Sequence, residues 1–523
     1  MYLLITFLIF LITLFLLAVF RFSKRPFGVS WVTAALGSIS ILVSIFLWQM
    51  NLPYSPPAIS WNPTDVFHSP IAFQADTYSW LFSLSFGGLL CAVLLTSPIR
   101  TANGFQPSSW IASIGFTGLG ILTVLAANPL TLALGWAAMD FAELINLFRL
   151  SDSPSASRSA ISGFSFRITG TFLAIFAGVL MIPTGQENSF QVGSSSLIAL
   201  LFLFSAGLRL GVIPLHITLR TDPGQRRGFG TIIRLITAAS SMILIVRIAE
   251  TTLSQSLVFW LVPFVAATGI FSAWNWLTIS GELQARPFFI IAVGALSIGA
   301  SIGGNALGSA VWGVALVLYG GISFLYSAHK TNLSVLLAAT SILLIGLPFT
   351  FSASAWIGTL PISVLYTPLF ILTELLVILG FVRHLFEHGE IDWQQLPVWA
   401  QSVYPIGLFL LPSLAVVMSV WGWEGSQAFG NLFVSIASLV IFMGIGFLAW
   451  KGRVVLNSII NIKIDPFSSL FFKFTDAIGT GFQQLAEVLV ALFKTLSNLL
   501  EGDGGLLWTM VFIILILLSV RGS

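Results

Sequence analysis

Long apolar runs, separated by short polar segments, recur along almost the whole chain. Because a helix needs about 20 mostly apolar residues to cross a bilayer, this pattern predicts about sixteen membrane spans. The predicted ranges are 2–20, 28–49, 77–96, 109–126, 128–148, 161–184, 195–218, 230–249, 255–279, 286–304, 307–327, 332–357, 360–384, 403–422, 428–450 and 505–520.

The segment 451–504 has a different pattern. Its apolar residues recur at steps of three and four, and charged or amide residues lie between them. This spacing predicts an amphipathic helix that lies along a surface with its apolar side down. The apolar set is Phe467, Leu470, Phe471, Phe474, Ile478, Phe482, Leu485, Val488, Leu489, Leu492 and Phe493.

Composition supports the membrane interpretation. Hydrophobic residues make up 57% of the 523 residues and charged residues 8%, with a mean hydropathy of +0.98. Ordinary soluble domains carry about 25% charged residues, so we predict an all-α polytopic membrane protein. A net charge of +3 leaves no basic face for a nucleic acid. A single cysteine and five histidines without metal-ligand spacing predict neither a metal nor a cofactor.

Loop charges predict the orientation of the chain. Loops after odd-numbered spans contain fourteen lysines and arginines, whereas loops after even-numbered spans contain little beyond Arg247 and Arg521. Positive loops remain on the cytoplasmic side. We therefore expect an integral protein of a bacterial-type inner membrane, with both termini on the outer side.

Six charged residues fall within predicted spans, where an unpaired charge costs a few kcal/mol or more. Two acids three residues apart share one face of a helix, so the simplest prediction is a buried cluster that pairs them with nearby arginines. These pairs could belong to an ion pathway or could only clamp the helices together, and the residues nearest to helix ends could instead snorkel. The six are Asp140, Glu143, Arg167, Arg209, Arg234 and Glu374.

Two prolines interrupt apolar spans, Pro214 in the seventh and Pro348 in the twelfth. Broken helices at matching positions indicate an inverted repeat, here spans 4–8 against spans 9–13. The predicted units are 1–108 (spans 1–3), 109–249 and 250–384 (the repeats), 385–450 (spans 14 and 15), 451–504 (the lateral helix) and 505–523 (the last span).

Several segments resemble one family. The run 206–216, which includes Arg209, Pro214 and His216, is similar to the broken seventh helix of the antiporter-like subunits of respiratory complex I, Mrp antiporters and membrane-bound hydrogenases. The segments 73–82, 166–170 and 346–348 resemble other helix starts and the second broken helix. A lateral helix before a last span resembles the distal complex I subunit. The resemblance implies two inverted five-helix bundles, proton or sodium translocation, and neighbouring membrane subunits in a larger complex.

The chain departs from that family at ionisable positions. The family's helix 5 glutamate is replaced by Ala137, although Asp140 lies one turn further on. A proton relay needs groups that gain and lose protons, and arginine effectively does not. The other replaced positions are Arg209 for lysine, Arg234 for histidine, Leu316 and Gly320 in span 11, and Ala355 or Trp356 in span 12.

Three functions follow as hypotheses. The leading one is an antiporter-like subunit of a complex I-type assembly with a partly degenerate ion pathway. The alternative is a non-conducting scaffold that straps neighbouring subunits, and a stand-alone carrier of small solutes is the third. The sequence contains no recognisable catalytic site, so redox chemistry of an NADH dehydrogenase-like or hydrogenase-like complex would belong to partner subunits.

Overall fold

The computed structural model describes most of the chain up to residue 443. The described residues are 2–23, 27–57, 69–103, 107–150, 154–185, 189–190, 195–217, 227–249, 253–356, 366–387, 390–423, 426, 435–440 and 443. They all belong to one compact unit, Met1–Lys463. The predicted lateral helix, the last span and most of the fifteenth lie outside the described residues.

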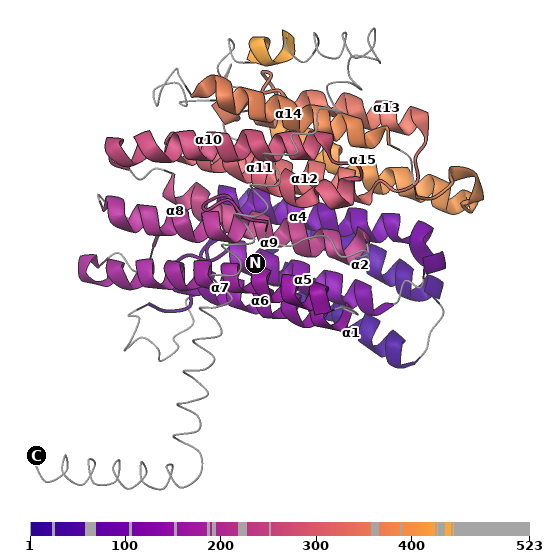
Figure 1. Cartoon of the computed structure of the whole chain (residues 1–523). Coiled ribbons are helices and arrows are strands. Elements are labelled where there is room, and N and C mark those ends of the chain that lie inside the picture. Colours follow the sequence, from indigo (N-terminus) through magenta and orange to yellow (C-terminus); the bar gives the residue numbers. More distant parts are fainter. Residues whose placement is uncertain are drawn as a thin grey trace, which may run out of the picture. The chain divides into compact units, whose positions relative to one another are not determined.

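The described part is all α-helical apart from short 3-10 turns and three isolated β-bridges. Figure 1 shows the helices lying side by side. The α-helices are α1 (Tyr2–Phe22), α2 (Phe27–Phe46), α4 (Thr77–Thr96), α5 (Pro107–Val124), α6 (Pro129–Leu150), α7 (Pro154–Met181), α8 (Ser196–Leu210), α9 (Arg227–Ile248), α10 (Gln255–Thr278), α11 (Glu282–Ile302), α12 (Ala306–Leu325), α13 (Thr331–Ala339), α14 (Thr367–Leu385) and α15 (Val398–Val420).

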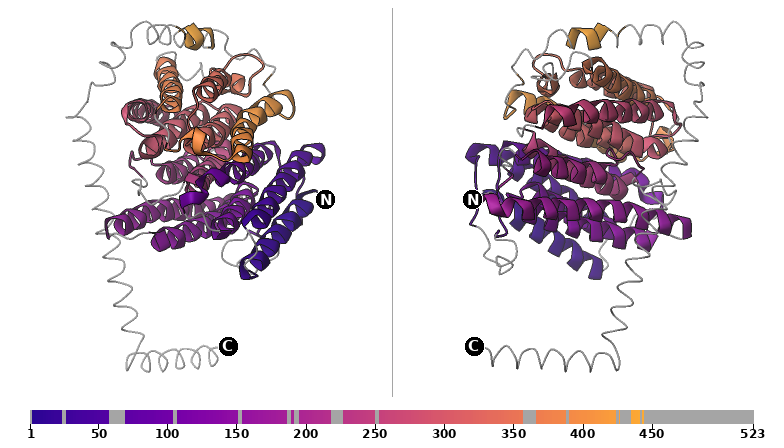
Figure 2. Two further views of the ribbon diagram at one scale, coloured as in Figure 1. Left: turned by 90° about the vertical axis from the view of Figure 1, so that its right-hand side faces the viewer. Right: turned by 60° about the vertical axis from the view of Figure 1, so that its left-hand side comes forward.

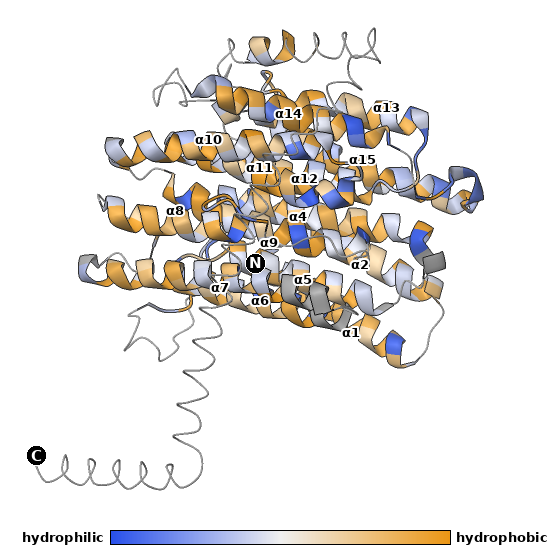
Figure 3. Cartoon of the chain, viewed as in Figure 1, coloured by the Kyte–Doolittle hydropathy of each residue, from blue (hydrophilic) through white to orange (hydrophobic). Residues whose placement is uncertain are grey.

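Eleven helices of the described part are long and apolar enough to cross a membrane, and three shorter apolar helices accompany them. Figure 3 shows apolar residues predominating along these helices. Each of the first fourteen predicted spans contains one of these helices. The prediction of an all-α polytopic membrane protein is therefore confirmed.

Both predicted helix breaks are present. The seventh predicted span, 195–218, stops being helical at Leu210, where Gly211 adopts a left-handed conformation (φ 79°) ahead of Pro214. The twelfth, 332–357, divides into α13, η4 (Thr340–Leu344) and η5 (Phe351–Trp356). Gly346 (φ 75°) and Phe349 (φ 65°) flank Pro348 in the second gap. Hydrogen bonds outside the regular helical pattern pair backbone groups in both gaps, such as those from the Val212 amide to the Gly207 carbonyl and from the Gly346 amide to the Ser352 hydroxyl.

The centre of the unit is formed by α4, α9 and α12, which contact one another. Nearly all of their residues are buried, whereas α1 exposes Leu4, Leu11 and Phe15 on its outer face. Figure 2 shows the indigo N-terminal helices at one edge of the bundle. A helix that is apolar on all sides can lie in a protein core or face lipid. The exposed fractions of the side chains therefore distinguish the central helices from the peripheral ones.

Candidate functional site

Two acids of α6 point into the protein. Asp140 and Glu143 are three positions apart, on one face of the helix, and are 0% and 1% exposed. This placement contradicts the snorkelling alternative for Glu143. Buried carboxylates require partners, and the partners come from α7, α8 and α9.

Asp140 is bound by two arginines. The Arg209 guanidinium donates to both carboxylate oxygens, with Nη1 2.6 Å from Oδ2 and Nη2 3.1 Å from Oδ1. The Arg167 Nε donates to Oδ1 at 3.0 Å. Bidentate arginine–carboxylate pairs are the stronger class of charged hydrogen bond, so Asp140 joins α6, α7 and α8.

Arg209 uses the rest of its guanidinium as well. Its Nη1 also donates to the Arg167 carbonyl at 3.1 Å and the Thr171 hydroxyl at 2.8 Å, and its Nε donates to the Ser241 hydroxyl at 3.1 Å. The guanidinium carbon lies 4.3 Å from the centre of the Trp136 ring, a cation–π contact. Arg209 of α8 is thus held by contacts with three neighbouring helices, α6, α7 and α9.

Glu143 extends the same group of charges. Its Oε1 lies 3.3 Å from Nη1 of Arg167 and 3.3 Å from Nη1 of Arg234 on α9. The Thr237 hydroxyl is 3.4 Å from Oε2. The α6–α9 cluster, which we define as Asp140, Glu143, Arg167, Arg209 and Arg234, contains three guanidinium groups and two carboxylates, so its formal charge is +1.

A glycine allows the helices of the cluster to approach closely. A Cβ atom at Gly170 of α7 would lie 2.7 Å from the Ser205 carbonyl oxygen and 2.7 Å from Cγ of Arg209. The Ser205 hydroxyl donates to the Gly170 carbonyl at 2.6 Å. Contact of α7 and α8 at this point brings Arg209 within reach of the α6 carboxylate.

The broken end of α8 follows Arg209 by two residues. His216 lies beyond Pro214, is buried, and stacks on Phe166 with ring centres 3.8 Å apart. Its Nδ1 is 2.8 Å from the Pro214 carbonyl oxygen, which can only accept, so Nδ1 carries a hydrogen. The segment that resembles the family's broken helix is therefore packed directly against α7, next to Arg167.

Glu374, the sixth predicted charge, lies on α14 and takes no part in this cluster. It is 0% exposed, and neither carboxylate oxygen accepts a hydrogen bond of normal geometry. No arginine, lysine or histidine of the described part forms an ion pair with it. The sequence predicted the buried charge, but not its isolation.

A second charged group was missed by sequence reasoning because its members sit at helix starts and in a loop. Arg227, the first residue of α9, pairs with Glu282 of α11 and donates to both carboxylate oxygens of Glu390, at 2.8 and 2.7 Å. Its Nη1 donates to the Phe324 carbonyl at 3.3 Å, at the end of α12. Arg286 is buried nearby, over the Phe324 ring at 4.8 Å. Spacing alone could not reveal pairs that are 163 residues apart.

Asp76, in the segment 73–82, is the N-cap residue of α4. Its carboxylate Oδ1 accepts a hydrogen bond from the Ser79 amide at 2.8 Å, and the Ser79 hydroxyl oxygen accepts one from the Asp76 amide at 2.8 Å. This is a capping box. Asp76 also lies 3.0 Å from Nη1 of Arg247, which ties α4 to the end of α9.

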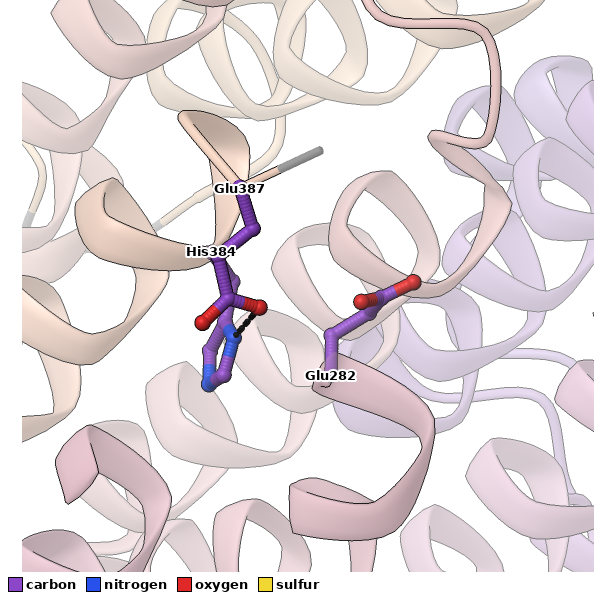
Figure 4. Close-up of side chains that lie close together, drawn as sticks. All are labelled: Glu282, His384 and Glu387. Atoms are coloured by element: carbon purple, nitrogen blue, oxygen red, sulfur yellow. Dashed lines mark hydrogen bonds and ion pairs between the residues drawn. The ribbon is translucent and has the colours of Figure 1, made fainter. Parts of the chain in front are cut away.

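Figure 4 shows Glu282, His384 and Glu387 close together, with possible ligand atoms within 4.8 Å of one another. Each already has partners. Glu282 pairs with Arg227, Nε2 of His384 is 2.9 Å from the Trp276 carbonyl oxygen, and Nδ1 is 3.0 Å from Glu387. We assign the group to ion pairing and hydrogen bonding rather than to a metal.

Acidification will weaken the contact between the Glu390 loop and α9. The hydrogen bonds from Arg227 hold the pKa of Glu390 below its ordinary value of 4.5. Because the pKa of Glu390 is lower in the folded than in the unfolded protein, the Arg227–Glu390 pair stabilises the fold above about pH 4.5. This stabilisation is lost as the pH falls through the folded pKa. Because the Glu390 side chain is 56% exposed, the effect should stay below about 1 kcal/mol.

The measurement is the thermal midpoint of the purified chain in detergent between about pH 3 and pH 7. Glu390→Gln should lose part of the decline below pH 4.5, because glutamine does not titrate. An unchanged decline in that variant would show that other groups account for it.

Comparison with solved structures bears on the fold. A chain of the Mrp complex from Dietzia sp. DQ12-45-1b matches with a TM-score of 0.72 at 12% identity, covering 99% of this chain and 62% of that one. A chain of the membrane-bound sulfane sulfur reductase, an archaeal respiratory membrane complex, matches with a TM-score of 0.62 at 14% identity, covering 99% and 100%. A chain of respiratory complex I from Thermus thermophilus matches with a TM-score of 0.60 at 14% identity, covering 80% and 98%. This chain has the fold of their membrane subunits.

The matched chains come from assemblies that include an Mrp complex and respiratory complex I, two of those whose antiporter-like subunits the sequence motifs resemble. No family model matches the chain, and no curated protein sequence does. The chain spans about 62% of the length of the Mrp chain it matches. At identities of 12–14%, these matches show a shared fold.

Two positions of α12 where the resemblance implies a histidine and a lysine are packed among apolar side chains. A Cβ atom at Gly320 of α12 would lie 2.8 Å from Cδ2 of Leu235, and Leu316 is fully buried. The position where the resemblance implies a helix 5 glutamate, Ala137, differs in its surroundings, because the neighbouring Trp136 contacts the Arg209 guanidinium. Among the described residues, the buried acids and arginines of the segment 109–249 are members of the α6–α9 cluster and Arg227 at the start of α9, whereas those of the segment 250–384 are Glu282 and Arg286 at the start of α11 and Glu374 on α14.

Proposed function

We propose that the chain is an antiporter-like membrane subunit of a complex I-type assembly that translocates protons or sodium ions, and that its own pathway is partly degenerate. The shared fold supports the general kind of protein. The observation that carries the proposal is the α6–α9 cluster, in which Asp140 and Glu143 are buried against three arginines from three neighbouring helices.

In this proposal Asp140, or Glu143 beside it, is the acid that holds the transported ion. Arginine does not release its proton under working conditions, so the three guanidinium groups act as electrostatic neighbours. Charged groups at membrane depth usually mark an ion route or a partner contact. The broken end of α8 supports the same placement, because interrupted helices of transporters occur at ion-binding sites and this break begins two residues after Arg209.

The proposal also includes the location of the chain, its partner subunits and its internal repeats. Charge asymmetry supports an inner-membrane location with both termini outside, and the matched complexes support other membrane subunits as partners. We place the two inverted repeats at 109–249 and 250–384, which puts one helix break in each. Redox chemistry, if the assembly performs any, belongs to partner subunits.

A specific observation favours a second candidate, the non-conducting scaffold. Every nitrogen of the Arg209 guanidinium donates to an acceptor within the bundle. A fully satisfied buried network rigidifies the helices that contribute to it. Such a network can hold helices together without moving an ion.

One experiment separates the two candidates. The affinity-purified native assembly is reconstituted in liposomes with a pH-sensitive dye, and a native gel reports whether each variant assembly is intact. If the subunit conducts, Asp140→Asn in an intact assembly should reduce proton flux, whereas Asp392→Asn, at an exposed loop acid, should not. Flux unchanged by Asp140→Asn and Glu143→Gln together would remove this assignment and leave the scaffold.

A further inference from the structure

Glu374 differs from the other buried acids of the described part. Asp140, Glu143 and Glu282 each lie within ion-pair distance of an arginine. Glu374 has no such partner, and its oxygens accept no hydrogen bond of normal geometry. A carboxylate in an apolar interior without a cation is very costly, so the group is stable there in its neutral form, with its proton bound.

The helices around Glu374 contain almost no charge. The segments α10, α12, α13 and η5 contain no aspartate, glutamate, lysine or arginine. The charged residues of α11, Glu282 and Arg286, lie in its first five residues, about 20 Å along the axis from Gly299. Arg383 of α14 is nine residues beyond Glu374 and is directed to the Leu277 and Ile279 carbonyls. On these described helices, no positively charged side chain is therefore placed to neutralise an ionised Glu374.

A pocket lies beside this carboxyl group. It is a small pocket, with a cavity volume of about 30 Å³, and is lined by residues of α10, α11, α12, η5 and α14 together with Tyr366, which precedes α14. Phe370 lines the pocket one helical turn before Glu374, on the same face of α14. Trp356 also lines it, and its indole is the polar neighbour of the carboxyl group. The aromatic residues are Trp312, Trp356, Tyr366 and Phe370.

The pocket lies at one end of the helices that line it. Its residues come from the last turns of α11 (Gly299, Ala300), the start of α12 (Trp312) and the start of α14 (Thr367, Phe370). The predicted orientation places the end of α11 and the starts of α12 and α14 on the outer side of the membrane. The arginine-rich starts of α9 and α11 then lie on the opposite side.

We propose that Glu374 is a proton-exchanging site that is reached from the outer side of the membrane through the aromatic pocket. The inference rests on the proposed function, because it assigns an ion-handling acid to the second half of the fold. We take its substrate to be a proton, since the described lining of the pocket supplies no carboxylate, which is the usual ligand of a hard metal cation. Unlike Asp140, this acid has no arginine of the described residues within ion-pair distance.

Dicyclohexylcarbodiimide tests the proposal, because this apolar reagent attacks protonated carboxyl groups. The carboxyl O–H adds across one C=N bond to give an O-acylisourea, and the acyl group then migrates to nitrogen to give a stable N-acylurea. No atom leaves, so the peptide gains the mass of one reagent molecule. Peptide mass spectrometry of the full chain should show Glu374 labelled at least about tenfold more than the arginine-paired Asp140 and Glu143. Equal labelling of the three would overturn the proposal.

Two variants and a pH gradient sharpen the test. Phe370→Trp, which adds bulk to the pocket wall, should slow labelling at Glu374 without removing the acid. In sealed, oriented vesicles, raising the pH on the outer side alone should reduce labelling, because the ionised carboxylate does not react. Labelling that instead follows the pH of the inner side, or that Phe370→Trp leaves unchanged, would refute access through the pocket.

Glu374→Gln separates this proposal from the proposed function. Glutamine resembles the protonated acid in size and lack of charge, so the variant should keep the thermal midpoint of the parent chain. If the subunit conducts, Glu374→Gln in the intact assembly should lose proton flux. Flux that persists in this variant would overturn the role of Glu374. A parent assembly without flux, but with Glu374 labelling that follows the outer pH, would contradict the proposed function and leave the protonation site standing.

Discussion

Replacing Asp140 with alanine will destabilise the chain by about 3–5 kcal/mol, the usual cost of removing one partner from a buried ion pair. The carboxylate accepts three hydrogen bonds, two from Arg209 and one from Arg167. Its loss leaves the cluster, whose formal charge is already +1, with three guanidinium groups and one carboxylate. The measurement is reversible unfolding in mixed micelles, followed by helical signal.

The matched control is Asp392→Ala, which removes an exposed acid that caps a single turn and should cost far less. A second comparison uses the apolar pair Asp140→Leu with Arg209→Met, since replacing a whole buried ion pair by apolar residues is often close to neutral. If Asp140→Ala costs no more than Asp392→Ala, the α6–α9 cluster does not hold these helices together.

Replacing Arg227 with methionine should cost about 3 kcal/mol, although Arg227 makes no ion pair with the α6–α9 cluster. Methionine keeps the apolar stem but removes the partner of Glu282, which is buried at the start of α11. It also frees the Phe324 carbonyl at the end of α12. The cost arises mainly because an unpaired buried carboxylate remains, so unfolding of the purified chain in mixed micelles measures it.

Glu390→Gln is the control for this prediction. Glu390 contacts the same guanidinium, but its side chain is 56% exposed, and exposed ion pairs contribute below about 1 kcal/mol. Arg227→Met should therefore be clearly more harmful than Glu390→Gln. Similar losses in the two variants would mean that the surface contact, and not burial of Glu282, dominates.

The sequence identified the charged residues of the site but not their arrangement. Asp140 and Glu143 share a face because they are three residues apart on one helix, and that is visible in the sequence. Which arginine meets which acid is not, because Arg167 and Arg209 are 27 and 69 residues from Asp140. The isolation of Glu374 is equally invisible, since it depends on which helices surround it.

The membrane spans and helix breaks were accessible from sequence for a local reason. Span length is set by bilayer thickness, and a break needs only a residue such as Gly211 or Pro348 within an apolar run. The group of Arg227, Glu282 and Glu390 was missed because its members lie at helix starts and in a loop, where charges are ordinary. Only burial and proximity set them apart.

The amino-acid sequence by itself determined the class of the protein, its apolar helices, and which charges enter the membrane, because hydropathy and backbone preference act over a few neighbouring residues. The tertiary structure alone decided that Asp140 is held between two arginines while Glu374 stands beside a pocket without a counter-charge. The physical reason is that charge pairing depends on distances between helices, and packing sets those distances.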